Sequence, residues 1–379
     1  MAEAVAGGRV KPGTSPRLPG VPSCHLANGA AGYRFRAPTA GVWREMDLAM
    51  ARLRWLGSRP AFLGWTALAL VAAALCSASA LRAQQDCPWC GTTGGLAPVS
   101  VEGVVDLHVH SAPDSGPRSI GSLEIARIAR DAGMRALLLK NHFAPTAGLA
   151  YAVERAVPGI RIFGGIALNS TTGINPIAVE HMARTTGGHG KVVWMPTFDS
   201  EHYHRVLSPN PHHVPVSSDG KLLPAVVAVL DSIAKHGLTL ATGHSSPAES
   251  LLLIREARSR GIERIVVTHP LPPPVGMSIA DQSAAAALGA KLEYPVGTAL
   301  ASNVHWQGSA EEKFQAYAAA IREVGPESVV ISSDLGQAMN PIHTDGLAVF
   351  LAKLLGAGFT QDEVDLMART NPAWVLGLE

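Results

Sequence analysis

The stretch that decides the fold is Val101-Glu-Gly-Val-Val-Asp-Leu-His-Val-His110, an apolar run that ends in two histidines. Side chains alternate along a strand, so residues spaced i, i+2 point to the same face of a sheet. His108 and His110 are therefore predicted to converge at the carboxyl end of a strand. Two imidazoles at one strand end provide the beginning of a divalent-metal site.

Seven further apolar runs follow the first one, and helical stretches separate them. The predicted strands cover residues 103–108, 135–140, 160–167, 191–196, 238–243, 263–268, 289–294 and 327–333. The predicted helices cover residues 121–132, 146–156, 176–184, 223–236, 247–260, 279–288, 310–324, 345–355 and 361–378. The runs lack a regular polar face, as expected of parallel strands covered by helices. This α/β alternation over ~280 residues predicts a single (β/α)8 TIM-type barrel, a fold of typically ~250 residues.

The alternative α/β architecture is an open doubly wound sheet. Such a sheet needs a glycine-rich phosphate-binding turn after its first strand. Here the turn is His110-Ser-Ala-Pro-Asp-Ser-Gly-Pro-Arg118, with proline where such a turn needs glycine, and no G-x-G-x-x-G or Walker sequence occurs. Nucleotide cofactors are therefore not expected. The longest irregular stretch, Thr197 to Leu222, is a candidate lid.

Later strands also end in residues that bind metals or charged groups. These residues are Lys140, His244, His269 and Asp334. In a TIM-type barrel the carboxyl ends of the strands meet at one mouth, so all four are expected near His108 and His110. Imidazole nitrogens and carboxylate oxygens suit zinc, with other transition metals as substitutes. An aspartate beside a metal-activated water is placed to take its proton.

This order of residues resembles the amidohydrolase superfamily, which has His-x-His on strand 1, His on strands 5 and 6, and Asp on strand 8. The ending Thr370-Asn-Pro-Ala-Trp-Val-Leu-Gly-Leu378 is also similar to the superfamily's ending. Two further motifs, Asp-Leu-His-x-His-x-x-Pro-Asp…Arg and Lys-Asn-His, resemble an uncharacterised amidohydrolase-like branch. The resemblance covers about residues 101–379.

The resemblance implies a role for each of these residues. It implies that His108 and His110 bind one metal and that His244 also binds a metal. It further implies that His269 binds a second metal or positions the water, and that Asp334 is a metal ligand and the general base. Asp334 and His269 are thus the expected catalytic residues.

The chain departs from the superfamily at the group that bridges two metals. Two-metal members place a carboxylated lysine or a glutamate on strand 4, but the fourth run here ends in Met195-Pro-Thr-Phe-Asp199. Lys140 on strand 2 either bridges as a carboxylated lysine or holds a substrate carboxylate as an ammonium, so one or two zinc ions are expected. Arg118 and His142 are the expected substrate-binding residues.

The resulting hypothesis is a metal-dependent hydrolase that cleaves an amide, cyclic amide, ester or lactone bond of a small-molecule substrate. Two alternatives stay open. A phosphoesterase of the polymerase-and-histidinol-phosphatase type also begins with Asp-Leu-His-x-His. A non-catalytic exported binding protein would keep the barrel without the chemistry. The formal net charge of +1 gives no reason to expect a nucleic-acid partner.

The N-terminal part differs from the barrel. Residues 1–45 are rich in Gly, Pro, Ala and Arg and are expected to be a disordered extension, with the true start at Met46 or Met50. Residues 46–83 combine a basic stretch, an apolar run and an Ala-x-Ala-like exit, which predicts a signal peptide or, if uncleaved, a membrane anchor.

Residues 84–100 form a Gly/Pro-rich linker, in which Cys87 and Cys90 are expected to form a local disulfide. The protein is accordingly expected to be exported, periplasmic or extracellular, or else membrane-anchored. A membrane is a partner only if the N-terminal segment is uncleaved. A homo-oligomer is compatible with the sequence.

Overall fold

The computed structural model describes residues 99–208 and 212–378 of the chain. The expected extension, the signal or anchor segment and the Cys87–Cys90 pair lie outside the described residues. Within those residues, no helix is long and apolar enough to cross a membrane.

Eight strands form one sheet in the order β1-β2-β3-β4-β7-β8-β9-β10, and every neighbouring pair is parallel. The strands are β1 (Val105–Val109), β2 (Ala136–Leu139), β3 (Arg161–Ala167), β4 (Gly190–Trp194), β7 (Thr239–Ala241), β8 (Ile265–Val267), β9 (Lys291–Pro295) and β10 (Val329–Ser332). Just beyond β10, the Asp334 N–H donates to the His108 carbonyl (2.9 Å) and the His110 N–H donates to the Leu335 carbonyl (3.0 Å). These bonds close the sheet, which confirms the predicted (β/α)8 barrel.

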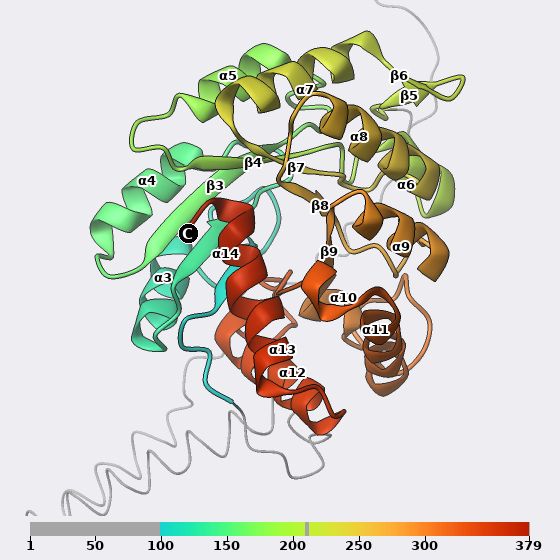
Figure 1. Ribbon diagram of the computed structural model, residues 1–379. Helices are drawn as coiled ribbons and strands as arrows, with labels where there is room; N and C mark the ends of the chain where they lie inside the picture. The colour runs from blue at the N-terminus through green and yellow to red at the C-terminus, as the bar shows by residue number, and fades with distance from the viewer. Residues whose placement is uncertain (1–98, 209–211, 379) are drawn as a thin grey trace, which may run out of the picture. The chain divides into compact units, whose positions relative to one another are not determined.

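Helices surround the sheet, and each predicted helical stretch contains one (Figure 1). Those between strands include α3 (Ser122–Asp131), α4 (Ala147–Ala156), α5 (Pro176–Ala183), α7 (Pro224–His236), α8 (Pro247–Ser259), α9 (Ile279–Ala287), α10 (Val296–Ala299), α11 (Ala310–Val324) and the short η1 (Pro326–Ser328). After the last strand come α12 (His343–Gly356), α13 (Gln361–Asp365), η2 (Leu366–Thr370) and α14 (Asn371–Leu376). Capping boxes begin α8 at Ser246 with Glu249 and α11 at Ser309 with Glu312, which explains where these helices start.

The apolar core has two layers. The larger one lies between the strands and the surrounding helices. The smaller one gathers inward-facing residues of seven strands, among them Leu107, Leu138 and Val330, together with Val375 and Leu376 of α14. In addition, the Thr239 hydroxyl at the start of β7 donates to the Val375 carbonyl (2.6 Å). The C-terminal helix α14, red in Figure 1, therefore closes the end of the barrel where the strands begin.

A β-bulge in β1 aims the first histidine. Asp106 pairs with Leu137 and Val109 pairs with Leu139, so β1 advances three residues where β2 advances two. The strand β1 therefore has one extra residue. Leu107 consequently packs in the interior core while the next residue, His108, also turns toward the barrel axis. The Asp106 carboxylate accepts hydrogen bonds from the His108 N–H (3.1 Å) and the Ser333 N–H (2.8 Å). Bulges of this kind re-aim side chains next to functional sites.

The described part of the stretch from Thr197 to Leu222 is less irregular than its sequence suggests. It contains the helix α6 (Glu201–Val206) and a small hairpin of β5 (Ser217–Ser218) and β6 (Lys221–Leu222). The Ser200 hydroxyl caps α6 and also donates to the His244 carbonyl (2.8 Å). The stretch is therefore attached to the carboxyl end of the barrel.

Candidate metal centre

A cavity of about 310 Å³ opens at the carboxyl end of the strands. Every residue that the sequence singled out as a ligand, catalytic group or substrate contact lines it. These residues are His108, His110, Arg118, Lys140, His142, His244, His269 and Asp334. Side chains separated by more than 220 positions in the sequence are thus brought together because the closed barrel juxtaposes its strand ends.

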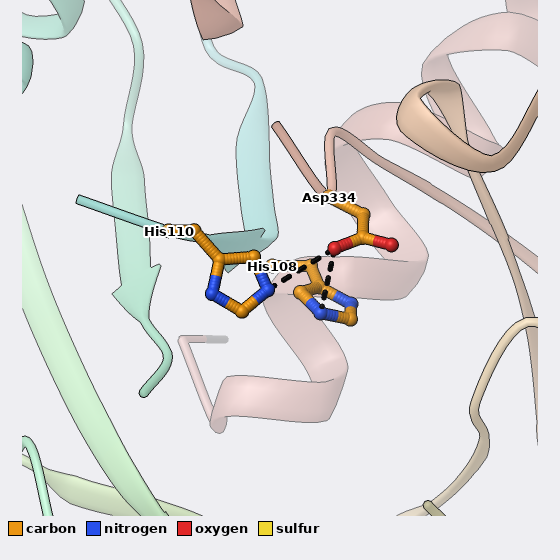
Figure 2. A group of neighbouring side chains, drawn as sticks. All are labelled: His108, His110 and Asp334. Atoms are coloured by element: carbon orange, nitrogen blue, oxygen red, sulfur yellow. Dashed lines mark ion pairs between the residues drawn. The ribbon is translucent and has the colours of Figure 1, made fainter. Parts of the chain in front are cut away.

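His108, His110 and Asp334 form the centre of the site. The Oδ1 atom of Asp334 lies 3.1 Å from Nε2 of His108 and 3.1 Å from Nε2 of His110 (Figure 2). Among the described residues these three form a group whose ligand atoms lie within 4.8 Å of one another, close enough to hold a metal ion. The prediction that the two histidines share one face is confirmed by this geometry.

Glu293 on β9 orients the ring of His108. The Nδ1–H of His108 donates to Oε1 of Glu293 (2.9 Å), and the Ser332 hydroxyl donates to the same oxygen (2.8 Å). Since Nδ1 carries the hydrogen, Nε2 presents its lone pair to the cavity. A carboxylate behind a histidine in this manner is the usual support of a metal-binding imidazole.

Lys140 reaches the same group from β2. Its Nζ atom lies 2.9 Å from Nε2 of His108 and 5.4 Å from the ring centre of Trp194, which ends β4. Burial lowers the pKa of Lys140 to about 8. The lysine thus stands next to the strand on which the amidohydrolase superfamily carries its bridging group.

His244 and His269 form a second pair of imidazoles in the cavity, with ring centres 4.8 Å apart. The ring of His269 stacks at 6.3 Å on that of His108, and the ring of Tyr203 stacks at 5.3 Å on that of His244. Gly243 precedes His244 at φ +61°, where a Cβ would lie 2.2 Å from the Met195 carbonyl oxygen. Only glycine fits this turn, which places His244.

Backbone strain is concentrated at the site. Among the described residues, three that are not glycine have a positive φ: Asp219, His269 and Asp334. His269 has φ +27° and Asp334 has φ +46°, so both expected catalytic residues adopt a conformation that costs of order 1–3 kcal/mol. Strain retained just beyond β8 and just beyond β10 is typical of positions where function fixes the side chain.

Burial also sets the charge state of the histidines. It lowers the pKa of His108 to about 3 and that of His269 to about 4, and it holds the pKa values of His110 and His244 well below the usual 6.5. At neutral pH these imidazoles are uncharged. Their lone pairs are then available, as metal binding requires.

Arg118 and His142 lie in the loops above the centre. Nε and Nη2 of Arg118 both contact Oδ2 of Asp114 at 2.7 Å, so the Asp…Arg part of the sequence motif is an ion pair at the cavity wall. The ring of His142 stacks at 4.8 Å on that of His110 and contacts Thr197 through Nδ1.

The sequence interpretation overlooked or left undecided several residues that shape the site. One of them is Glu293, whose carboxylate accepts the hydrogen bond from Nδ1 of His108. In the sequence it is only a single acidic residue inside an apolar strand. Asp106 accepts from the backbone N–H groups of His108 and Ser333 rather than from a histidine ring. Phe198 and Tyr203 contribute an aromatic wall, which their position in the stretch from Thr197 to Leu222 indicated only in general terms.

Comparison with known structures supports the class of fold. The chain is similar to the organophosphorus hydrolase from Deinococcus radiodurans, with a TM-score of 0.50 and 15% identity over 75% of this chain and 99% of that chain. It is similar to an organophosphate hydrolase engineered from a weak promiscuous lactonase, with a TM-score of 0.51 and 15% identity over 75% and 99%. An amidohydrolase from Pseudomonas aeruginosa has a TM-score of 0.49 and 14% identity over 72% and 96%.

With its closed parallel barrel, the chain has the same (β/α)8 fold as the organophosphorus hydrolase to which it is similar. The profile of a family of unknown function, DUF6282, matches residues 103–293, and the chain belongs to this family. A search among curated proteins found no match.

Proposed function

We propose that this protein is a metal-dependent hydrolase whose metal is held by His108, His110 and Asp334. The observation that carries the proposal is the convergence of both Nε2 atoms on one carboxylate oxygen at 3.1 Å, at the floor of a cavity. The partly buried carboxylate of Asp334 receives no hydrogen bond from either imidazole if both Nε2 atoms present lone pairs to it. A metal cation bound between the two Nε2 atoms and the carboxylate would be stabilised by all three groups.

The donor set fits zinc. Two imidazole nitrogens and a carboxylate oxygen leave a coordination position open, as catalytic zinc sites require. When bound, the metal would acidify a water molecule and polarise the bond that is cleaved. His244 and His269 would help to hold a second metal, and Lys140 would join them as a ligand if its amine is carboxylated. In the alternative with one metal, Lys140 would hold the substrate as an ammonium.

The remaining roles follow from position. Asp334 is the group placed to accept the proton of the attacking water, since its carboxylate faces the cavity beside both histidines. His269 would bind a second metal or position that water. Arg118 is fixed by Asp114 at the wall, where its guanidinium would contact an oxygen-rich part of the substrate.

The substrate we propose is a small molecule with an ester-type bond, such as a lactone, with amides and cyclic amides as the further candidates. The names of the similar structures, an organophosphorus hydrolase and an engineered lactonase, favour this choice. The cavity supports it as well, because Phe198, Leu207 and Met339 give its wall an apolar part that suits a hydrocarbon group. Phosphotriesters belong in the same test.

The proposal is tested with the full-length protein, loaded with zinc and assayed on a panel of lactones, aryl esters, amides and phosphotriesters. We expect turnover of at least one class and, because Asp334 is the proposed base, a loss of at least ~100-fold in kcat for Asp334→Asn, within the ~10²–10⁴-fold range of general-base catalysis. The variant is expected to keep part of its metal, since the amide oxygen and both histidines remain. Full activity of Asp334→Asn would show that another residue is the base.

Metal counting distinguishes the two roles of Lys140. If Lys140 bridges as a carboxylated lysine, the wild type binds close to two equivalents and Lys140→Ala close to one. One equivalent in both proteins would instead make Lys140 a substrate contact.

A further inference from the structure

The ring of His142 is held by contacts on its faces and at Nδ1, so the position of its other nitrogen, Nε2, is fixed. It is buried, yet it lines the cavity. One face of its ring stacks on His110 and the ring also packs on Phe198, with centres 4.8 and 4.0 Å apart. Its Nδ1 atom lies 2.9 Å from the hydroxyl oxygen of Thr197. Only Nε2 is left to face a bound molecule, and it has no partner among the described residues.

Asn169 determines the direction of the hydrogen bond between Thr197 and His142. The Asn169 Oδ1 atom accepts from the backbone N–H groups of Thr197 (2.8 Å) and Asp199 (3.2 Å). Its Nδ2 donates to the His142 carbonyl (2.7 Å) and to the Thr197 hydroxyl oxygen (2.7 Å). The amide can have only one orientation, because its oxygen meets two donors and its nitrogen meets a carbonyl.

The Thr197 hydroxyl already accepts a hydrogen from Asn169, so its own hydrogen needs an acceptor. Thr197 is fully buried, and a buried donor without an acceptor is costly. The acceptor within reach is Nδ1 of His142. If Nδ1 itself carried a hydrogen, the hydroxyl would accept twice and its hydrogen would have no acceptor among the described residues. Nδ1 is therefore the unprotonated nitrogen, and Nε2 carries the hydrogen.

We propose that His142 is not a metal ligand but a hydrogen-bond donor, whose Nε2–H binds the substrate oxygen on which negative charge develops during hydrolysis. Asn169 and Thr197 are positioning residues that fix its tautomer. No bond to His142 forms or breaks, and its hydrogen stays on Nε2. The catalytic part of this inference rests on the proposed hydrolase function, whereas the tautomer and the binding of an anion are independent of turnover.

The tautomer is tested by NMR of the full-length protein labelled with ¹⁵N-histidine, with His142→Gln to assign the signals. We expect His142 to show an unprotonated Nδ1 and a protonated Nε2. Thr197→Val should move the Nδ1 resonance because the hydroxyl donor is lost, and the matched variant Thr197→Ser should leave it in place. A protonated Nδ1 in the wild type, or a Nδ1 resonance that Thr197→Val does not move, would overturn the assignment.

Binding is tested in the same sample with inorganic phosphate as the anionic probe. The Nε2 resonance of His142 should shift as phosphate is added, and no shift would overturn the donor role. Metal content is expected to be equal in the wild type, His142→Gln and His142→Ala, and loss of metal in either variant would make His142 a ligand.

Turnover separates this inference from the proposed function. On a substrate found in the panel, His142→Ala should lower kcat by ~10²–10³-fold, as loss of one oxyanion donor does. His142→Gln should recover part of that loss, because its amide N–H₂ reaches the place of Nε2–H. If the wild type hydrolyses nothing, the proposed function fails while the NMR and metal measurements still decide the state of His142.

Discussion

Two carboxylates hold opposite edges of the His108 ring, and each has a different task. Glu293 receives the Nδ1–H, and Asp334 faces Nε2. Burial raises the pKa of Glu293, so its charge depends on the groups around it, His269 and Lys140 among them. Glu293 thus fixes the orientation of the His108 ring, whereas Asp334 is available to bind a metal and to accept a proton.

At this scale we predict that Glu293→Gln weakens metal binding. The variant keeps an oxygen beside Nδ1 but loses the negative charge that makes His108 a better ligand, so metal affinity should fall by about 10–100-fold. Competition with a chelator measures the affinity. Glu312→Gln, which alters an exposed helix cap, is the matched control. Equal affinity in Glu293→Gln and the wild type would show that Glu293 has no influence on the metal.

At the scale of elements, the β1 bulge and the turn after β10 form the site together. Asp106 joins them by accepting from the N–H groups of His108 and Ser333. Gly336 lets the following turn pass over β1, because a Cβ there would lie 2.0 Å from the His110 carbonyl oxygen. The contacts that close the barrel between β1 and β10 consequently also set the geometry of the His108–His110–Asp334 group.

Replacing Asp106 tests this closure. Asp106→Ala leaves two buried N–H groups without an acceptor, so the free energy of unfolding should fall by about 1–3 kcal/mol for each of them. Asp106→Asn keeps an oxygen acceptor, so its free energy of unfolding should fall less than that of Asp106→Ala. Denaturant unfolding measures both variants, and an unchanged stability of Asp106→Ala would contradict the role of Asp106.

The same residue predicts a dependence on pH. Burial raises the pKa of Asp106 from 3.8 to about 6, so the folded state binds its proton more tightly than the unfolded chain does. Its contribution to stability is therefore complete below pH 3.8 and is lost as the pH rises through about 6. The difference in unfolding free energy between wild type and Asp106→Asn should decline across this window. A difference in unfolding free energy that stays constant or increases with pH would contradict the raised pKa of Asp106.

The elements themselves were predictable from local chemistry. Apolar runs separated by helical stretches predicted the strands and helices, and the structure confirms them. The Ser-x-x-Glu sequences at Ser246 and Ser309 are local signals of the same kind, since the structure has capping boxes there. The bulge was not predictable, because the run from Val104 to His110 looks the same with or without an extra residue in its pairing.

The same limit applies to the site. Ligand-type residues at strand ends were found because a barrel brings those ends together. Glu293, Asn169 and Thr197 were not assigned roles, since each acts through contacts with residues distant in sequence and nothing in its immediate sequence distinguishes it.

At the scale of the barrel, stability and chemistry occupy opposite ends. The helix α14 fills the end where the strands begin, and the histidines gather where they finish. In TIM-type barrels, residues at the first end serve stability and residues at the second serve function.

We therefore predict that Leu376→Ala, which empties a fully buried position in α14, lowers the free energy of unfolding by about 2–5 kcal/mol. Metal content per folded protein should not change. Denaturant unfolding and metal analysis of the same preparation measure both quantities. Loss of metal without loss of stability would contradict the separation of the two ends.

The proposed hydrolase function depends most directly on a bound metal. Elemental mass spectrometry of the purified full-length protein, compared with His110→Ala, is the measurement that tests it. We predict one or two equivalents of a divalent transition metal, zinc first, in the wild type, and loss of the metal bound by His108, His110 and Asp334 in the variant. A wild type that binds no divalent metal even when reconstituted would contradict the hydrolase proposal and favour a binding protein.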